Sequence, residues 1–312
     1  MKTIFIEQLE PGTELFDQPF LLLDVTSRKT KDDRPFILFH LGDKSGRIGG
    51  VFWNVPDAVM ETCPPGKVVL VTGGVRLYND RPQVLAFDLQ PFEPASMADF
   101  VASSRRPRDE MVAELRETVG ELREPLRKLL ADILLEPAFL ERFAQAPAAK
   151  RMHHAAVGGL LEHTLALVPF CRLVARRYPL VDLDLLIAGA LLHDVGKVLS
   201  YHAGGGFAAT NEEKLVGHIT RGAIMVEMAA EKIPSFPAEL RQQVLHLVVS
   251  HHGTLEWGAP VVPRTLEAVL LHQIDLLDSR AQGFIDHISA EPGGNRWTSR
   301  SAMFGCELMR KT

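Results

Sequence analysis

The sequence predicts an α+β multidomain chain in which a five-stranded β-barrel precedes an all-α domain. Three observations support this fold class. The first 92 residues alternate short β-branched and aromatic runs with polar turns, which is typical of a small all-β domain. From residue 109 onward, apolar residues recur at helical spacing, and Gly or Pro separates the segments. The length of 312 residues, 46% hydrophobic and 23% charged, suits two globular domains.

Bulk composition excludes several classes of protein. The net charge of -5 gives no overall basic character, so nucleic-acid binding has to come from local patches. The three cysteines form no CxxC pair, which argues against a zinc ribbon and fits a reducing compartment. The N-terminus meets an acidic residue too early for a signal peptide, and no apolar run reaches membrane-spanning length. We therefore expect a cytoplasmic protein without a membrane segment.

The N-terminal part is predicted to contain five strands, with a short helix near residues 55–62. The predicted strands cover residues 20–25, 36–41, 47–53, 68–75 and 84–89. The turn signal Asp43-Lys44-Ser45-Gly46 connects the second strand to the third. This arrangement resembles an OB-fold, a small barrel that binds single-stranded nucleic acid. We therefore assign residues 1–92 to an OB-fold nucleic-acid-binding domain.

The rest of the chain divides into a linker and helical segments. Residues 93–108 are polar and contain two prolines, one near each end of the stretch. They are expected to form a linker. Residues 109–150 are predicted to form a helical connector with a kink near Pro125. Residues 151–312 are the predicted all-α domain together with a C-terminal tail.

Adjacent His193 and Asp194 end an apolar run and predict a metal centre in the all-α domain. A buried carboxylate beside a buried imidazole is costly unless something compensates both groups, and a metal ion does so. Further candidate ligands stand in or beside apolar helical sequence: His163, His218, His251 and Asp275. Imidazole and carboxylate ligands without cysteine suit manganese, iron, cobalt or zinc, and argue against a structural zinc site.

These ligand candidates, in this order, resemble the HD-domain metal-dependent phosphohydrolases in the version that carries two metal ions. The strings Gly158–Thr164, Leu192–Lys197 and Ser250–Gly253 are more specifically similar to the YhaM-type 3'-5' exoribonucleases. That family pairs an N-terminal OB-fold with a C-terminal HD domain, and the resemblance covers nearly the whole chain. It implies an HD domain at residues 151–312.

The resemblance also implies how the metal ions are held. One ion would be held by His163, His193, Asp194 and Asp275. The second would be held by His218 and His251, with the catalytic Asp194 bridging the two ions. Whether His251 or the adjacent His252 is the ligand stays open; we favour His251, with His252 contacting substrate. The family expectation is two manganese ions, with iron, cobalt or zinc as alternatives.

The implied reaction is hydrolysis of single-stranded RNA from its 3' end to nucleoside 5'-monophosphates, with single-stranded DNA as a further substrate. Two metal ions can polarise a phosphodiester and activate water at neutral pH. Lys197 follows Asp194 by one helical turn, so we expect it to neutralise charge on the phosphate in a catalytic role. A helix-terminal cation that interacts with the helix dipole is the alternative for Lys197.

Basic and aromatic residues in two barrel hairpins are the candidates for RNA contact, since single-strand binders combine positive charge with aromatic faces. These candidates are Arg28, Lys29, Lys31, Arg34, Arg76, Tyr78 and Arg81. The metal domain adds His154 and His252. Neighbouring acidic residues predict modest affinity for the barrel alone, so a homo-oligomer with several barrels would help, and a protein-interaction role is the alternative.

Two other functions stay open. The HD core also serves hydrolysis of small or cyclic nucleotides, although a mononucleotide enzyme needs no strand-binding barrel. A nucleic-acid-binding regulator with an inert HD domain is a hypothesis of another class, which the complete ligand set disfavours. Fold resemblance alone does not establish the reaction.

Overall fold

The structure is a computed structural model, and its residues form two compact units. The residues described are 2–30, 32–79, 81–95, 97, 99–101, 103–104, 106–149, 156–201, 209–290 and 295–311. The first unit comprises Met1–Ser103, and the second comprises Ser104–Tyr201 and Ala209–Thr312. Among these described residues, no helix combines the length and the apolarity that crossing a membrane requires.

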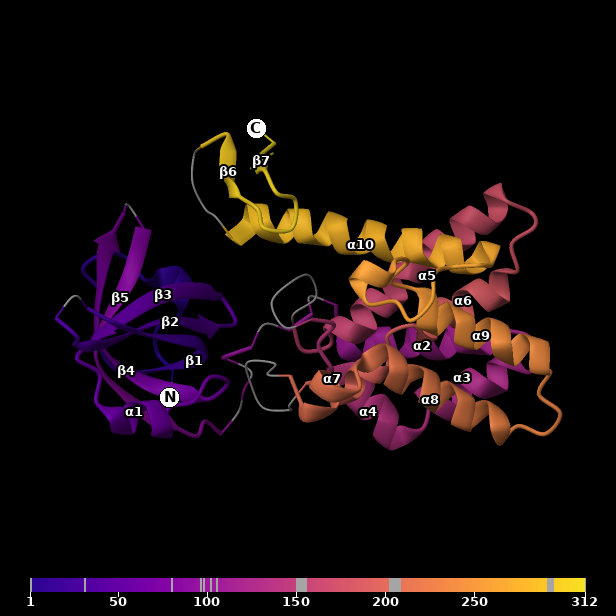
Figure 1. The fold of residues 1–312 in the computed structure, drawn as a ribbon, viewed down its shortest axis with the longest axis horizontal. Coiled ribbons are helices and arrows are strands. Elements are labelled where there is room, and N and C mark those ends of the chain that lie inside the picture. Colours follow the sequence, from indigo (N-terminus) through magenta and orange to yellow (C-terminus); the bar gives the residue numbers. More distant parts are fainter. Residues whose placement is uncertain are drawn as a thin grey trace. The chain divides into compact units, whose positions relative to one another are not determined.

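The first unit is a closed barrel with the strand order β1-β2-β3-β5-β4 (Figure 1). Its elements are η1 (Ile6–Gln8), β1 (Glu14–Lys29), β2 (Pro35–Asp43), β3 (Gly46–Trp53), α1 (Asp57–Thr62), β4 (Val68–Tyr78) and β5 (Arg81–Phe92). Neighbouring strands are antiparallel except for β3 and β5, which are parallel. Five strands closed in this order, with a helix between β3 and β4, confirm the predicted OB-fold.

Each strand is longer than the apolar run that predicted it. In the β1–β2 hairpin, pairing continues to Lys29 opposite Pro35, and in the β4–β5 hairpin to Tyr78 opposite Arg81. Polar residues at hairpin ends carry no hydrophobic periodicity, which is why the pattern ended too early. Phe39 and Phe52 lie in the barrel core, whereas Trp53 is half-exposed and its ring stacks on Phe36 with the centroids 4.6 Å apart.

Part of the segment that composition marks as a linker packs on the barrel. Phe100 and Val101 are buried. Asp99 Oδ1 accepts a hydrogen bond from Lys44 Nζ at 2.7 Å, and Lys2 Nζ lies 5.7 Å from the centroid of the Phe100 ring. Two apolar side chains in a polar stretch are too few to show as a periodic pattern.

The second unit is helical. Its helices are α2 (Arg108–Glu121), α3 (Leu126–Leu134), α4 (Pro137–Gln145), α5 (Gly159–Arg177), α6 (Leu183–Leu192), η2 (Val195–Leu199), α7 (Asn211–Leu215), α8 (His218–Glu231), α9 (Ala238–Ser250), η3 (Leu255–Trp257) and α10 (Leu266–Ala290). The kinked connector helix is a wrong prediction, because α2 and α3 are separate helices. Pro125 precedes the first residue of α3, where its missing N–H costs no helical hydrogen bond.

A short hairpin follows α10, where the sequence indicated only a tail. Strands β6 (Trp297–Arg300) and β7 (Glu307–Met309) pair with each other. Strands of four and three residues are too short for an alternating pattern to be recognised.

Helix α6 lies at the centre of the helical unit. Every residue from Leu185 to Leu192 is buried, and α6 packs against α3, α5, α9 and α10. A helix that is apolar on all sides is stable only when it is surrounded in this way. At its N-terminus, Asp182 accepts a hydrogen bond from the backbone N–H of Leu185 at 3.2 Å. The packing therefore fixes the C-terminal end of α6, with His193 and Asp194, inside the domain.

Candidate metal centre and nucleic-acid interface

Five helical segments bring the predicted ligands together. His163 lies in the second turn of α5, and Asp275 lies in the middle of α10. His193 is the C-cap residue of α6, and Asp194 follows it. The other predicted ligands, His218 and His251, are the first residue of α8 and the first residue after α9, and His252, which was predicted to contact substrate, follows His251. We refer to these seven residues as the metal centre.

Asp194 faces two sets of imidazoles with its two carboxylate oxygens. Its Oδ2 lies 3.3 Å from His193 Nε2 and 4.0 Å from His163 Nε2. Its Oδ1 lies 3.5 Å from His218 Nε2 and 3.6 Å from His251 Nε2. One carboxylate thus stands between two groups of ligand atoms, which is the arrangement that a bridging ligand requires.

A hydrogen bond at Nδ1 fixes each of the five imidazoles. The acceptors are the carbonyl oxygens of Ala190, Val248 and Trp257 for His193, His251 and His252, and the carboxylates of Asp278 and Glu213 for His163 and His218. These acceptors place the proton of a neutral ring on Nδ1, so that Nε2 keeps the lone pair. Partners of this kind are the ones that orient metal-ligating histidines.

The residues present fit divalent metal ions. Among the described residues, two groups of three have ligand atoms within 4.8 Å of one another: His163, His193 and Asp194, and His218, His251 and His252. Asp194 Oδ1, His218 Nε2 and His251 Nε2 are buried without a hydrogen-bond partner among the described side chains. An unsatisfied buried polar atom costs roughly 1–3 kcal/mol. Nitrogen and oxygen donors that converge in this way suit a divalent transition metal, and a bound ion would remove that cost.

Lys197 pairs with the carboxylate that the two groups share. Lys197 lies in η2, and its Nζ donates a hydrogen bond to Asp194 Oδ2 at 2.6 Å. Burial alone would raise the pKa of Asp194, but Lys197 and His193 outweigh burial and hold that pKa well below its usual range. Burial lowers the pKa of Lys197, but the charge of Asp194 and the hydrogen bond to it outweigh burial and raise that pKa above its usual value. Both groups are therefore charged at neutral pH.

The imidazoles differ in their affinity for protons. Burial lowers the pKa of His251 and of His252, so both rings are neutral at neutral pH. Burial also opposes protonation of His163, but hydrogen bonds to Asp275 and Asp278 outweigh it and raise its pKa to about 9. Because a metal ligand must be neutral imidazole, a cation bound by His163 has to displace this proton.

Gly196 allows the start of α8 to approach Asp194. A Cβ atom at position 196 would lie 2.1 Å from the carbonyl oxygen of His218, which is closer than any real contact. A larger residue would push α8 away together with His218, its first residue. The glycine after the His-Asp pair is therefore a packing requirement of the metal centre.

Sequence reasoning missed the two carboxylates behind the imidazoles. Asp278 Oδ2 lies 2.8 Å from His163 Nδ1, and Glu213 Oε1 lies 3.1 Å from His218 Nδ1. The sequence spacing could have indicated Asp278, because it follows Asp275 by three residues and so shares a face of the same helix. Glu213 lies in a short polar helix whose sequence carries no such signal.

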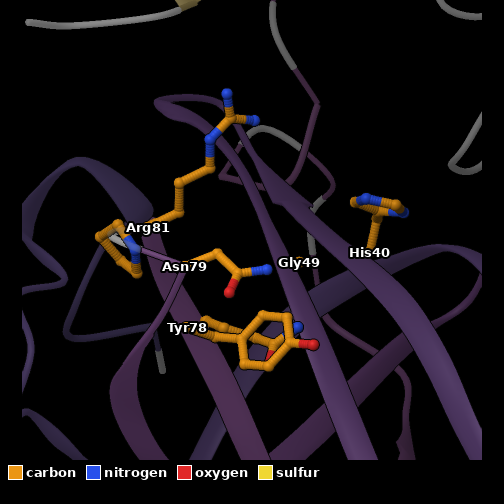
Figure 2. Close-up of a pocket in the computed structure, with 7 residues that line it drawn as sticks. His40, Gly49, Tyr78, Asn79 and Arg81 are labelled. Atoms are coloured by element: carbon orange, nitrogen blue, oxygen red, sulfur yellow. The ribbon is translucent and has the colours of Figure 1, made fainter.

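The barrel carries a pocket of about 550 Å³ formed by β2, β3 and the β4–β5 hairpin (Figure 2). Its lining residues are His40, Gly49, Tyr78, Asn79, Arg81, Pro82 and Gln83. Tyr78 is 63% exposed. Of the predicted RNA-contact residues, Tyr78 and Arg81 thus lie together in a hollow that offers an aromatic face and a cation.

The other predicted contact residues lie at the ends of the hairpin strands or near them. Lys29 Nζ lies 2.8 Å from Asp33, and Arg76 lies 2.6 Å from Glu14. Exposed ion pairs of this kind are weak, so the cations remain available to a phosphate. Arg28 and Arg34 are exposed. The predicted residues Lys31 and His154 lie outside the described residues.

Comparison with known proteins identifies both parts of the chain. The HD domain family model matches residues 160–280, and the model of the OB-fold nucleic acid binding domain matches residues 24–92. The 3'-5' exoribonuclease YhaM of Bacillus subtilis (strain 168) is 32% identical over 270 residues, which are 86% of this chain and 85% of that protein. The chain belongs to the YhaM family.

Two further YhaM proteins match over a similar length. The YhaM protein of Oceanobacillus iheyensis is 31% identical over 276 residues, covering 86% of this chain and 84% of the relative. That of Listeria innocua is 32% identical over 264 residues, covering 83% and 84%. The HD match includes the whole metal centre, and the OB-fold match includes the barrel pocket. The chain therefore contains an HD domain and an OB-fold nucleic acid binding domain.

Proposed function

We propose that this chain is a metal-dependent 3'-5' exoribonuclease that hydrolyses single-stranded RNA to nucleoside 5'-monophosphates. The observation that carries the proposal is Asp194, whose two oxygens face separate imidazole groups in a buried site. Membership of the YhaM family and a barrel of the nucleic-acid-binding type support it. The proposed enzyme is a phosphodiesterase of the HD hydrolase class.

We assign the ligands as two groups that share Asp194. His163, His193 and Asp275 complete the first group, because Asp275 Oδ1 lies 3.3 Å from His163 Nε2. His218 and His251 belong to the second group. We add His252 to the second group as a ligand, because its ligand atom lies with theirs.

The hydrolysis follows from what the surrounding residues do. A pair of divalent cations, when bound, polarises the phosphodiester and lowers the pKa of a water molecule. Asp194 stays anionic between the two groups, and Lys197 has N–H donors beyond the one on Asp194 to place on a phosphate oxygen. The water oxygen forms a bond to phosphorus, and the bond from phosphorus to the 3'-oxygen of the preceding nucleotide breaks. One proton of the water ends on the leaving 3'-oxygen, which becomes the new 3'-hydroxyl. The released nucleotide keeps its 5'-phosphate.

The barrel holds the RNA strand in this proposal. Tyr78 offers a stacking face for a base, and the four basic hairpin residues neutralise phosphates: Arg28, Lys29, Arg34 and Arg76. Since these contacts are few and salt-screened, the affinity of one barrel is modest. We extend the proposal to manganese as the metal, to single-stranded DNA as a second substrate and to a homo-oligomer that presents several barrels.

The test is a time course with single-stranded RNA labelled at its 5' end, separated on a denaturing gel. With Mn²⁺ added, wild type should give a ladder that shrinks from the 3' end, and Asp194→Ala should leave the RNA intact. Phosphate release from mononucleotides without RNA shortening would favour a small-nucleotide hydrolase. Binding of RNA without turnover by metal-loaded wild type would favour a regulator.

A further inference from the structure

The turn after the second metal group places a tryptophan beside the metal centre. The 3-10 segment η3 ends with Trp257, whose carbonyl oxygen accepts the Nδ1 hydrogen bond of His252 at 2.6 Å. The turn is closed by its own backbone hydrogen bonds, from Trp257 to Thr254 at 3.2 Å and from Gly258 to Leu255 at 3.0 Å. The position of Trp257 is therefore fixed relative to His252.

The ring of Trp257 is anchored on its other side by α10. Its centroid lies 6.0 Å from that of His272, and His272 Nδ1 in turn lies 2.8 Å from the carbonyl oxygen of His251. His272 precedes the ligand Asp275 by three residues, so both lie on one face of α10, about 4.5 Å apart along the helix axis. The indole thus packs on a histidine that lies three residues before Asp275 and holds the backbone of His251.

Gly253 makes this packing possible. Its φ is +79°, and a Cβ atom there would lie 2.3 Å from the His272 ring. Only glycine lets the chain after His252 turn over His272 and bring Trp257 onto that ring. Packing covers only part of the Trp257 side chain, because Trp257 is 49% exposed and neighbouring Leu255 is 63% exposed. A large, anchored aromatic face is left open to a ligand.

We propose that Trp257 is the stacking platform for the nucleobase of the 3'-terminal nucleotide of the RNA. This inference rests on the proposed exoribonuclease function. An enzyme that removes nucleotides one after another must accept each base in turn, so it cannot depend on the edge of one base. Stacking meets this requirement, since every base has a π-face. Tryptophan offers the largest face among the side chains, and its anchoring on His272 lowers the entropy lost when a base stacks on it.

The test compares Trp257→Ala, Trp257→Phe and wild type on RNA that ends either in an ordinary nucleotide or in an abasic one. Trp297→Ala is the matched control, because Trp297 in β6 is 52% exposed. For ordinary RNA, Trp257→Ala should lower kcat/KM by roughly 10- to 100-fold, mainly through KM, and Trp257→Phe should restore most of the loss. The abasic end should be a poor substrate for wild type and no poorer for Trp257→Ala.

Three outcomes would overturn the inference. If wild type shortens RNA, an unchanged KM in Trp257→Ala would overturn this inference and leave the proposed function standing. A loss in Trp257→Ala that is equal for both RNA ends and accompanied by less bound Mn²⁺ would assign Trp257 to support of His252 and not to stacking. If metal-loaded wild type shortens neither RNA, the proposed function fails, and this inference fails with it.

Discussion

Replacement of Asp278 tests whether the carboxylate behind His163 sets the affinity of the first metal group. Asp278 is not itself in the metal centre, and it acts through a 2.8 Å hydrogen bond to Nδ1 of a buried ring. Loss of such an outer partner typically weakens metal binding by about 10- to 100-fold. We therefore expect Asp278→Ala to weaken the binding of one of two Mn²⁺ ions by about this factor at alkaline pH.

The pKa of His163 makes this loss depend on pH. At about pH 7 a pKa of about 9 means that a proton competes with the metal at His163 and weakens binding by about 100-fold. Asp278 is one of the groups that raise this pKa, so Asp278→Ala lowers the pKa and reduces the proton competition. Near neutral pH the gain offsets part of the loss. The ratio of wild-type to variant affinity should therefore be larger at about pH 9.5 than at about pH 7.

The assay is a competition titration of apoprotein with Mn²⁺ and a fluorescent chelator at both pH values. Asp278→Asn keeps a hydrogen-bond acceptor without the charge, so its affinity at alkaline pH should fall between those of wild type and Asp278→Ala. Asp286→Asn is the matched control, since Asp286 is exposed on the same helix and accepts a hydrogen bond from Gln282 at 2.7 Å. An affinity ratio that is equal at both pH values, or a ratio near one at alkaline pH, would refute the reasoning.

Three further predictions concern catalysis and stability. Asp194→Asn should lower the rate of RNA shortening by at least about 100-fold while the circular dichroism spectrum stays native. A retained rate would contradict the role of the shared carboxylate. Asp182→Ala should lower the free energy of unfolding by about 1–2 kcal/mol near neutral pH, because Asp182 caps α6. The Arg123 hydrogen bond lowers the pKa of Asp182. The Asp182 carboxylate therefore stabilises the fold above the unfolded pKa of about 4, and this stabilisation is lost as pH falls through the folded pKa. The free energies of unfolding of wild type and variant, measured with denaturant, should converge in acid, and a constant difference would contradict this. Gly253→Ala should destabilise by about 1–3 kcal/mol because of its positive φ and the His272 ring; an unchanged melting temperature would argue against that contact.

Local patterns in the sequence were enough to predict the fold class. Alternating apolar strands and turn signals are properties of neighbouring residues, so the five barrel strands could be predicted without knowing what they pack on. The apolar run of α6, ending at His193 and Asp194, likewise predicted a buried helix that carries ligands. The pattern failed where a proline separates α2 from α3 and where β6 and β7 are too short to show periodicity.

The sequence by itself determined which side chains could bind metal, because ligand chemistry belongs to the residue type and their order resembles a known family. Only the tertiary structure decided how these side chains are held. His163 and Asp278 are separated by 115 residues in the chain, and packing of α5 against α10 brings them within 2.8 Å. The two oxygens of Asp194 face different imidazole groups because the start of α5 and the end of α6 bring two rings to Oδ2, whereas the start of α8 and the end of α9 bring two others to Oδ1. Such distances depend on long-range packing, which no local pattern in the sequence encodes.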